Sequence, residues 1–122
     1  MRIGIDARLL AMPLTGIGRY TAELSRALVA QADAGCDSGA LPDVFHFYMP
    51  AAPVAGRWDA PQVRLRAGRV RGGRPARMLW SQTVMPWLAA RDGVDVFWGT
   101  SHRLPRLLPP HIARVVTIHD LV

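Results

Sequence analysis

Short runs of apolar residues alternate along the chain with two longer stretches whose apolar residues recur at helical spacing. The short runs predict five β-strands, over residues 2–6, 44–49, 62–66, 94–98 and 113–119. The third run alternates polar and apolar residues, as a half-exposed edge strand does. The fifth contains the run Val115-Val116-Thr117-Ile118, which is typical of a parallel strand covered on both faces. This order of elements predicts an α/β fold with a mostly parallel, Rossmann-like sheet flanked by helices.

The first helix is predicted to begin near Gly16, with Thr15 as its cap, and to end at Gly35. Apolar residues at three- and four-residue steps predict its buried stripe, formed by Ile17, Tyr20, Leu24 and Leu28. Residues 8–14, which precede this helix, are expected to form a connecting loop.

The second helix is predicted to open at Pro75 and to run to about residue 90, because proline fits the first helical turn. Pro86 lies inside this stretch. It lacks a backbone N–H and its ring crowds the preceding turn, so we expect it to kink the helix or to split it in two.

Composition narrows the class of protein. The 122 residues include 15 basic side chains, all arginine, and nine carboxylates, for a net charge of +6. This length suits one domain with a modest core. The single cysteine, Cys36, excludes an internal disulfide and a cysteine-based zinc site. No apolar run approaches the ~18 residues of a membrane span. The first run stops at Asp6 and does not read as a secretory signal. We therefore expect a cytoplasmic protein.

The glycines at the start of the first helix are one candidate site. Gly16 and Gly18 would let a ligand approach the backbone, where free N–H groups and the helix dipole favour a phosphate. A simple glycine-containing turn is an equally good interpretation. The dinucleotide fingerprint G-x-G-x-x-G is incomplete because Thr21 occupies its third glycine position. A nicotinamide cofactor is therefore not expected.

Polar residues that follow the predicted strands are the second kind of candidate. Ligands of open α/β sheets bind beyond the carboxyl ends of the strands. These ends carry Asp6, His102, His119 and Asp120. A histidine there could hold a sugar hydroxyl or donate a hydrogen bond to a phosphate or a developing alkoxide. The alternative is that each side chain merely caps a strand end or a turn. The four histidines show no metal-ligand spacing, so no metal site is expected.

Residues 57–91 combine basic and aromatic side chains. They hold eight arginines and three tryptophans: Arg57, Arg64, Arg66, Arg69, Arg71, Arg74, Arg77 and Arg91, with Trp58, Trp80 and Trp87. An ordinary solvated basic face over core tryptophans is the first interpretation. Peripheral contact with an anionic membrane is the second. No nucleic-acid motif accompanies the charge, and a nucleic-acid partner is not expected.

Four motifs together resemble a known family. In order, IGIDARLL, TGIGRYTAELSRAL, DVFWGTSHRLP and VVTIHDLV resemble the start of family 4 glycosyltransferases, the glycosyl transferase group 1 type. The nearest subgroup is similar to bacterial mannosyl- or rhamnosyltransferase-like enzymes of surface-polysaccharide assembly. The resemblance implies a GT-B fold, in which two Rossmann-like domains face each other. Residues 1–122 would be an incomplete N-terminal, acceptor-side domain without the donor-binding domain and its E-x7-E motif.

The resemblance also implies roles for individual residues. Gly16 and Gly18 would face the diphosphate of a nucleotide-sugar donor, and His119 would be the catalytic residue, near the reacting carbon of the sugar. His102, Asp120 and Asp6 would be candidate acceptor or sugar contacts. Transfer would retain anomeric configuration and need no metal, with which the absence of a D-x-D motif agrees. Beyond the nucleotide-sugar substrate and a glycan or lipid-linked acceptor, no cofactor is implied.

Two other functions remain as alternatives. A non-catalytic α/β binding or scaffold module would keep the fold without the chemistry. A nucleotide-sugar epimerase or another dinucleotide enzyme is disfavoured by the broken glycine fingerprint. An E-x7-E segment after Val122 would favour the transferase. We also expect this stretch of chain to self-associate by itself, because its last apolar strand has no helix to cover it.

Overall fold

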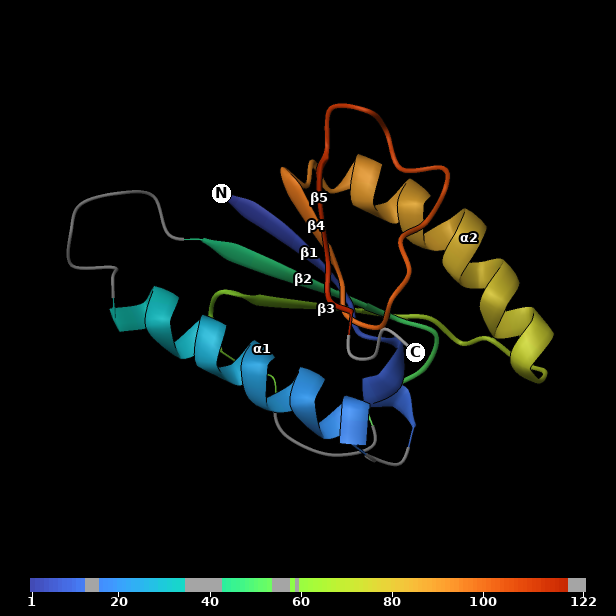
Figure 1. The fold of residues 1–122 in the computed structure, drawn as a ribbon, viewed down its shortest axis with the longest axis horizontal. Helices are drawn as coiled ribbons and strands as arrows, with labels where there is room; N and C mark the ends of the chain where they lie inside the picture. The colour runs from blue at the N-terminus through green and yellow to red at the C-terminus, as the bar shows by residue number, and fades with distance from the viewer. Residues whose placement is uncertain (13–15, 35–42, 54–57, 59, 119–122) are drawn as a thin grey trace.

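The structure is a computed structural model that describes residues 1–12, 16–34, 43–53, 58 and 60–118. Its described strands form a single five-stranded sheet in the order β3-β2-β1-β4-β5 (Figure 1). Their bounds are β1 Arg2–Asp6, β2 Val44–Met49, β3 Val63–Ala67, β4 Val96–Gly99 and β5 Ala113–Val116. Every neighbouring pair is parallel. The predicted α/β class with a Rossmann-like parallel sheet is confirmed.

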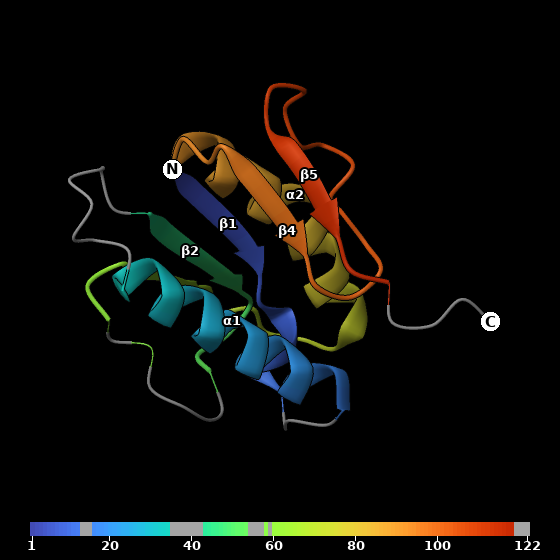
Figure 2. The same cartoon turned by 60° about the vertical axis from the view of Figure 1, so that its left-hand side comes forward.

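Two helices cover the sheet, one on each face. Figures 1 and 2 show α1 (Gly16–Ala34) on one face and α2 (Arg74–Arg91) on the other. Between β1 and α1 the chain forms a short 3-10 helix, η1 (Arg8–Ala11), where the sequence predicted only a loop. The predicted cap Thr15 and end Gly35 of the first helix, and Cys36, lie outside the described residues.

Alternating side chains of the strands supply two separate cores. On the α1 face, Phe45 and Phe47 of β2 pack with Ile5 of β1. On the α2 face, Tyr48 of β2 packs with Phe97 of β4. Successive residues of a strand point to opposite faces, which is why residues 45–48 feed both cores. Burying an aromatic or large aliphatic side chain contributes roughly 1.5–3 kcal/mol.

The buried face of α1 differs from the predicted stripe. Ile17 and Tyr20 are 37% and 45% exposed, and Leu24 is only partly buried against the core. The fully covered positions are instead occupied mostly by small residues: Thr21, Ala22, Ser25 and Val29. Leu24 and Leu28 pack against the same core but stay partly exposed. Thr21 satisfies its buried hydroxyl by donating to the Ile17 carbonyl at 2.9 Å.

The second helix runs unbroken from Arg74 to Arg91, so of the two effects predicted for Pro86, a kink or a split, the split does not occur. Pro86 is buried, and α2 residues on either side of it, such as Trp80 and Ala89, pack into the same core. Packing on the sheet therefore keeps the residues on both sides of Pro86 in one helix. Pro75 lies in the first turn, as predicted.

The fifth strand also departs from its prediction. It covers four residues rather than seven, and all four are exposed, with Val115 at 50%. In the described residues it pairs only with β4, so it forms one edge of the sheet. An apolar run alone does not reveal whether a strand is covered. β3 forms the opposite edge, as its alternating pattern predicted.

A buried carboxylate ties the end of α2 to the sheet. Asp92 accepts hydrogen bonds from the Tyr48 hydroxyl at 2.8 Å and from Arg66 at 2.6 Å. Burial by itself would raise the pKa of Asp92, but these hydrogen bonds outweigh it and the pKa lies below its ordinary value. Burial lowers the pKa of neighbouring His46, although Asp92 opposes this shift. The Asp92 carboxylate is therefore the negative charge of this cluster, and Arg66 balances it.

Within the described residues, no helix has the length and apolarity needed to cross a bilayer.

Candidate functional site

The sheet reverses its strand order between β1 and β4. From β1 the chain adds β2 and β3 on one side, then crosses over through α2 and adds β4 and β5 on the other. Open α/β sheets bind ligands at this switch point, beyond the carboxyl ends of the strands. Here the buried Thr100 hydroxyl donates to the Asp6 carbonyl at 2.6 Å, which fastens the ends of β4 and β1 together.

The Asp6 carboxylate, at the end of β1, is buried and is bound by Arg8. It is 1% exposed and accepts from the Arg8 backbone N–H at 3.2 Å and from the Arg8 Nε at 2.9 Å. Burial raises the pKa of Asp6, and the Arg8 guanidinium opposes the rise without cancelling it. The carboxylate therefore holds Arg8 in place. That Asp6 also contacts a sugar stays a prediction.

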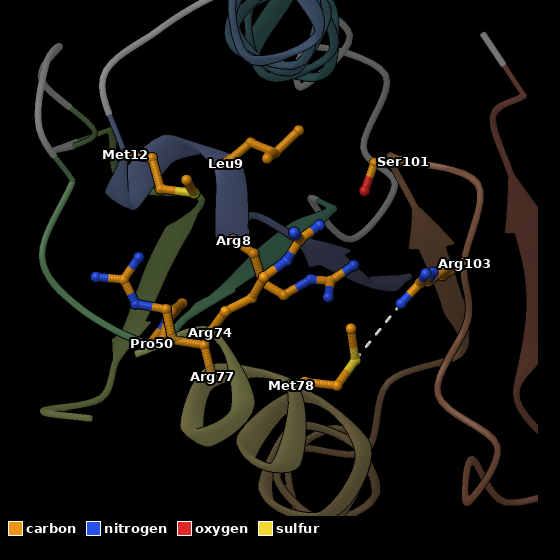
Figure 3. A pocket seen from close by; sticks show the side chains of 9 residues that line it. All are labelled: Arg8, Leu9, Met12, Pro50, Arg74, Arg77, Met78, Ser101 and Arg103. Atoms are coloured by element: carbon orange, nitrogen blue, oxygen red, sulfur yellow. Dashed lines mark hydrogen bonds between the residues drawn. The ribbon is translucent and has the colours of Figure 1, made fainter. Parts of the chain in front are cut away.

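A pocket of about 480 Å³ opens at the same edge. It lies between η1, the N-terminal half of α2 and the loop after β4 (Figure 3). Its walls are Arg8, Leu9, Met12, Pro50, Arg74, Arg77, Met78, Ser101 and Arg103. The volume falls within the range of small-molecule sites.

The lining of this arginine pocket is strongly basic. It contains four arginines and no carboxylate. Asp6 balances Arg8, whereas the described residues show no ion pair for Arg74, Arg77 or Arg103. The Arg103 guanidinium donates to the Met78 sulfur at 3.6 Å (Figure 3). Such a surface attracts anions, because each guanidinium offers several donors and keeps its charge at any physiological pH.

A glycine at the end of β4 shapes the loop that closes the pocket. A Cβ on Gly99 would collide with the Arg103 carbonyl oxygen, so only glycine lets the loop fold back this closely. Residue 102 takes a positive φ of 65°, and its N–H donates to the Thr117 carbonyl at 3.0 Å. The loop thus brings Ser101 and Arg103 to the pocket and leaves His102 exposed beside it.

The structure places some of the predicted site residues and not others. Gly16 is exposed in the first turn of α1, with open space where a Cβ would lie, and Gly18 is buried. Neither lines the arginine pocket. His119 and Asp120 lie outside the described residues. That Gly16, Gly18, His102 and His119 share one cleft therefore stays a prediction.

The pocket arginines were not recognised as a group from the sequence. Arg8 and Arg103 were not singled out, and Arg74 and Arg77 counted only as members of a basic segment. A usable signal existed for two of them, because Arg8 and Arg103 each follow closely after a predicted strand. The same edge rule that selected Asp6 and His102 could have selected them.

No family model matches the chain, and neither the search of curated proteins nor the search of solved structures found a significant match.

Proposed function

We propose that the chain is the N-terminal, acceptor-side part of a family 4 glycosyltransferase. The enzyme would transfer a hexose such as mannose or rhamnose from a nucleotide-sugar to a glycan or lipid-linked acceptor in surface-polysaccharide assembly. The reaction would be metal-independent and retaining, and would take place in the cytoplasm or at the inner face of the membrane. The proposal extends the resemblance of the four ordered motifs.

The observation that carries this proposal is the pocket at the β1/β4 switch point. It lies where a Rossmann-like sheet binds its ligands, and its arginines suit the phosphates of a nucleotide-sugar reaction. A scaffold module would need neither an open crevice at this edge nor guanidinium groups without carboxylate partners. The pocket therefore favours the transferase over a scaffold module, and the transfer assay below distinguishes it from a non-catalytic binding module.

Each residue has a distinct part in the proposed chemistry. The exposed first turn of α1, with open space at Gly16, lets a diphosphate oxygen approach backbone N–H groups and the positive end of the helix dipole. Gly18 follows in the same turn. His119 would donate a hydrogen bond to the transferred sugar close to the reacting carbon. His102 and Asp120 would contact acceptor or sugar hydroxyls.

Glycosyl transfer by the protein expressed from its whole reading frame tests the proposal. With a panel of nucleotide-sugars and acceptors, His119→Ala should lower turnover by ~100-fold or more, the usual scale for a proton-handling side chain. Gly16→Trp should raise the KM for the donor by filling its approach. His111→Ala is the matched control, because this exposed histidine precedes β5 at the opposite end of the sheet. No transfer with any donor, or full activity in His119→Ala, would count against the assignment.

Peripheral contact with an anionic membrane is part of the proposal, and one face of α2 supports it. Leu79 and Trp87, eight residues apart on the same side of the helix, are 65% and 57% exposed. The Arg91 guanidinium lies over the Trp87 ring, 5.3 Å from its centroid. The helix carries three arginines and no acidic residue, which matches a negatively charged surface. Trp58 and Trp80 are buried, so Trp87 alone provides the aromatic contact.

A further inference from the structure

We propose that the arginine pocket is a binding site for a phosphoryl dianion, either a phosphate monoester or a diphosphate. The first argument is charge. Three guanidinium groups of the lining, those of Arg74, Arg77 and Arg103, have no carboxylate partner among the described residues. One carboxylate ligand would balance only one of them. A phosphate or diphosphate brings two or more negative charges and several acceptor oxygens to the same point.

The second argument is an unused donor. The Nε of Arg77 is buried and has no hydrogen-bond partner in the part of the chain that the structure describes. A buried donor without an acceptor is costly, and native structures rarely leave one unpaired. Arg77 lines the pocket, so an anion seated there would supply the missing acceptor oxygen. The orphaned N–H thus points to a ligand rather than to a solvated basic surface.

The third argument is preorganisation. Asp6 holds Arg8 through contacts to both carboxylate oxygens, at 2.9 and 3.0 Å, so this guanidinium is already positioned. Among the described residues, the contact of the Arg103 guanidinium is a weak one with the Met78 sulfur, which leaves its other donors to a ligand. The apolar side chains of Leu9, Met12 and Met78 form the rest of the wall. They lower the local dielectric constant, which strengthens the attraction between a guanidinium and a phosphate.

The volume favours more than a single phosphate. At about 480 Å³, the pocket has room for a diphosphate together with part of the group that it carries. Within the glycosyltransferase, this ligand would be the phosphate or diphosphate of a lipid-linked acceptor, and that identity rests on the proposed function. Binding of the phosphoryl group itself rests on the pocket alone.

Titration calorimetry of the protein with sodium pyrophosphate and with inorganic phosphate, at constant ionic strength, tests the site. We expect saturable binding, tighter for pyrophosphate. Arg77→Gln should weaken it by about 10- to 100-fold, the loss expected for one charge-assisted hydrogen bond. Arg91→Gln is the matched control, because it removes the same charge from the far end of α2, roughly 20 Å away. It should change the affinity less than twofold.

Two results would overturn the site: no saturable binding of either anion, or equal losses in Arg77→Gln and Arg91→Gln, which would mean attraction by net charge alone. Arg103→Gln provides a second variant on an exposed loop position, so the test does not depend on how Arg77→Gln folds. It should weaken pyrophosphate binding in the same direction. Because these measurements need no transfer reaction, they can succeed where the glycosyltransferase proposal fails, and the reverse.

Vesicles distinguish the source of the phosphoryl group. Phosphatidic acid exposes a phosphate monoester, whereas phosphatidylserine at equal surface charge does not. Preference for phosphatidic acid, reversed by pyrophosphate and lost in Arg77→Gln, supports the site and assigns it to a lipid headgroup. Equal binding to both vesicles, together with retained pyrophosphate binding, supports the site and assigns it to a water-soluble phosphate.

Discussion

Replacing Asp92 by Asn tests the balance of burial and hydrogen bonding at the end of α2. The amide keeps the shape of the side chain and one acceptor oxygen, so the Tyr48 hydroxyl, 2.8 Å away, can keep a neutral hydrogen bond. Hydrogen bonds to a charged group contribute about 1.5–3 kcal/mol and are about twice as strong as neutral ones, so this change costs about 1 kcal/mol. The side chain of Arg66 is 48% exposed, and loss of its ion pair adds at most about 1 kcal/mol.

The expected loss at neutral pH is therefore about 1–2 kcal/mol, and it should depend on pH. The pKa of Asp92 is lower in the folded state than its ordinary value near 3.8. Its contribution is therefore present above that value and disappears as the pH falls through the folded-state pKa. The pKa of Asp6 is raised, which gives the opposite dependence, but Asp6 is present in both proteins and cancels in the difference. His46 faces Asp92 at 3.6 Å, so the comparison is repeated in a His46→Gln background to remove its titration.

Urea unfolding followed by tryptophan fluorescence, at several pH values from 7 to 3, measures the difference. Tyr48→Phe is the companion variant, because it removes only the hydroxyl and leaves Arg66 paired. Asp92→Asn should be less stable than the parent at pH 7, with the gap closing toward pH 3. Equal stability at pH 7, or a gap that persists unchanged in acid, would refute the reasoning.

Three further predictions follow from single positions. Gly99→Ala should lower the thermal midpoint of unfolding and also weaken pyrophosphate binding, because a Cβ at this position collides with the Arg103 carbonyl. Gly73→Ala is the control, since its Cβ meets nothing closer than 3.8 Å. Unchanged pyrophosphate binding in Gly99→Ala would contradict this account. Trp87→Ala should reduce sedimentation with anionic vesicles by several-fold, and salt should reduce parent binding because the attraction is screened; equal binding of the parent to neutral vesicles would contradict the electrostatic part. Val115→Glu should reduce self-association of the protein, measured by light scattering, since Val115 is 50% exposed on an edge strand. A parent protein that stays monomeric at all concentrations would exclude self-association through this strand.

The sequence predicted the fold well because the strands and helices follow different periods. The boundaries of β1 and β2 were predicted as observed, since each is a short apolar run with a clear stop. The buried face of α1 was not predicted, because Thr21, Ala22 and Ser25 are small and weakly apolar. Their burial comes from the packing of the helix on the sheet, which is a tertiary effect.

The sequence also did not show which strands are buried under helices and which are exposed. The apolar run at residues 113–119 suggested burial on both faces, yet Val115 and Val116 are exposed in the edge strand β5. Whether an apolar strand is covered depends on where the connecting helices lie, and periodicity carries no information about that. The continuity of α2 through Pro86 was not predicted for the same reason. Packing of α2 on the sheet outweighs the local preference of proline to break a helix.

Sequence patterns do not show which residues from distant segments the fold brings together at the candidate site. The rule for open sheets selected the edge at which the Thr100 hydroxyl donates to the Asp6 carbonyl. The four arginines of the pocket come from three segments that lie far apart in the sequence, so only the fold brings them together. Their charges repel one another, and the one nearby carboxylate, Asp6, is already engaged by Arg8. A site with more positive charge than its own neighbours neutralise costs stability while empty, and an anion relieves that cost only when it binds. The same imbalance that opposes folding is therefore what would draw the proposed phosphoryl group into the pocket.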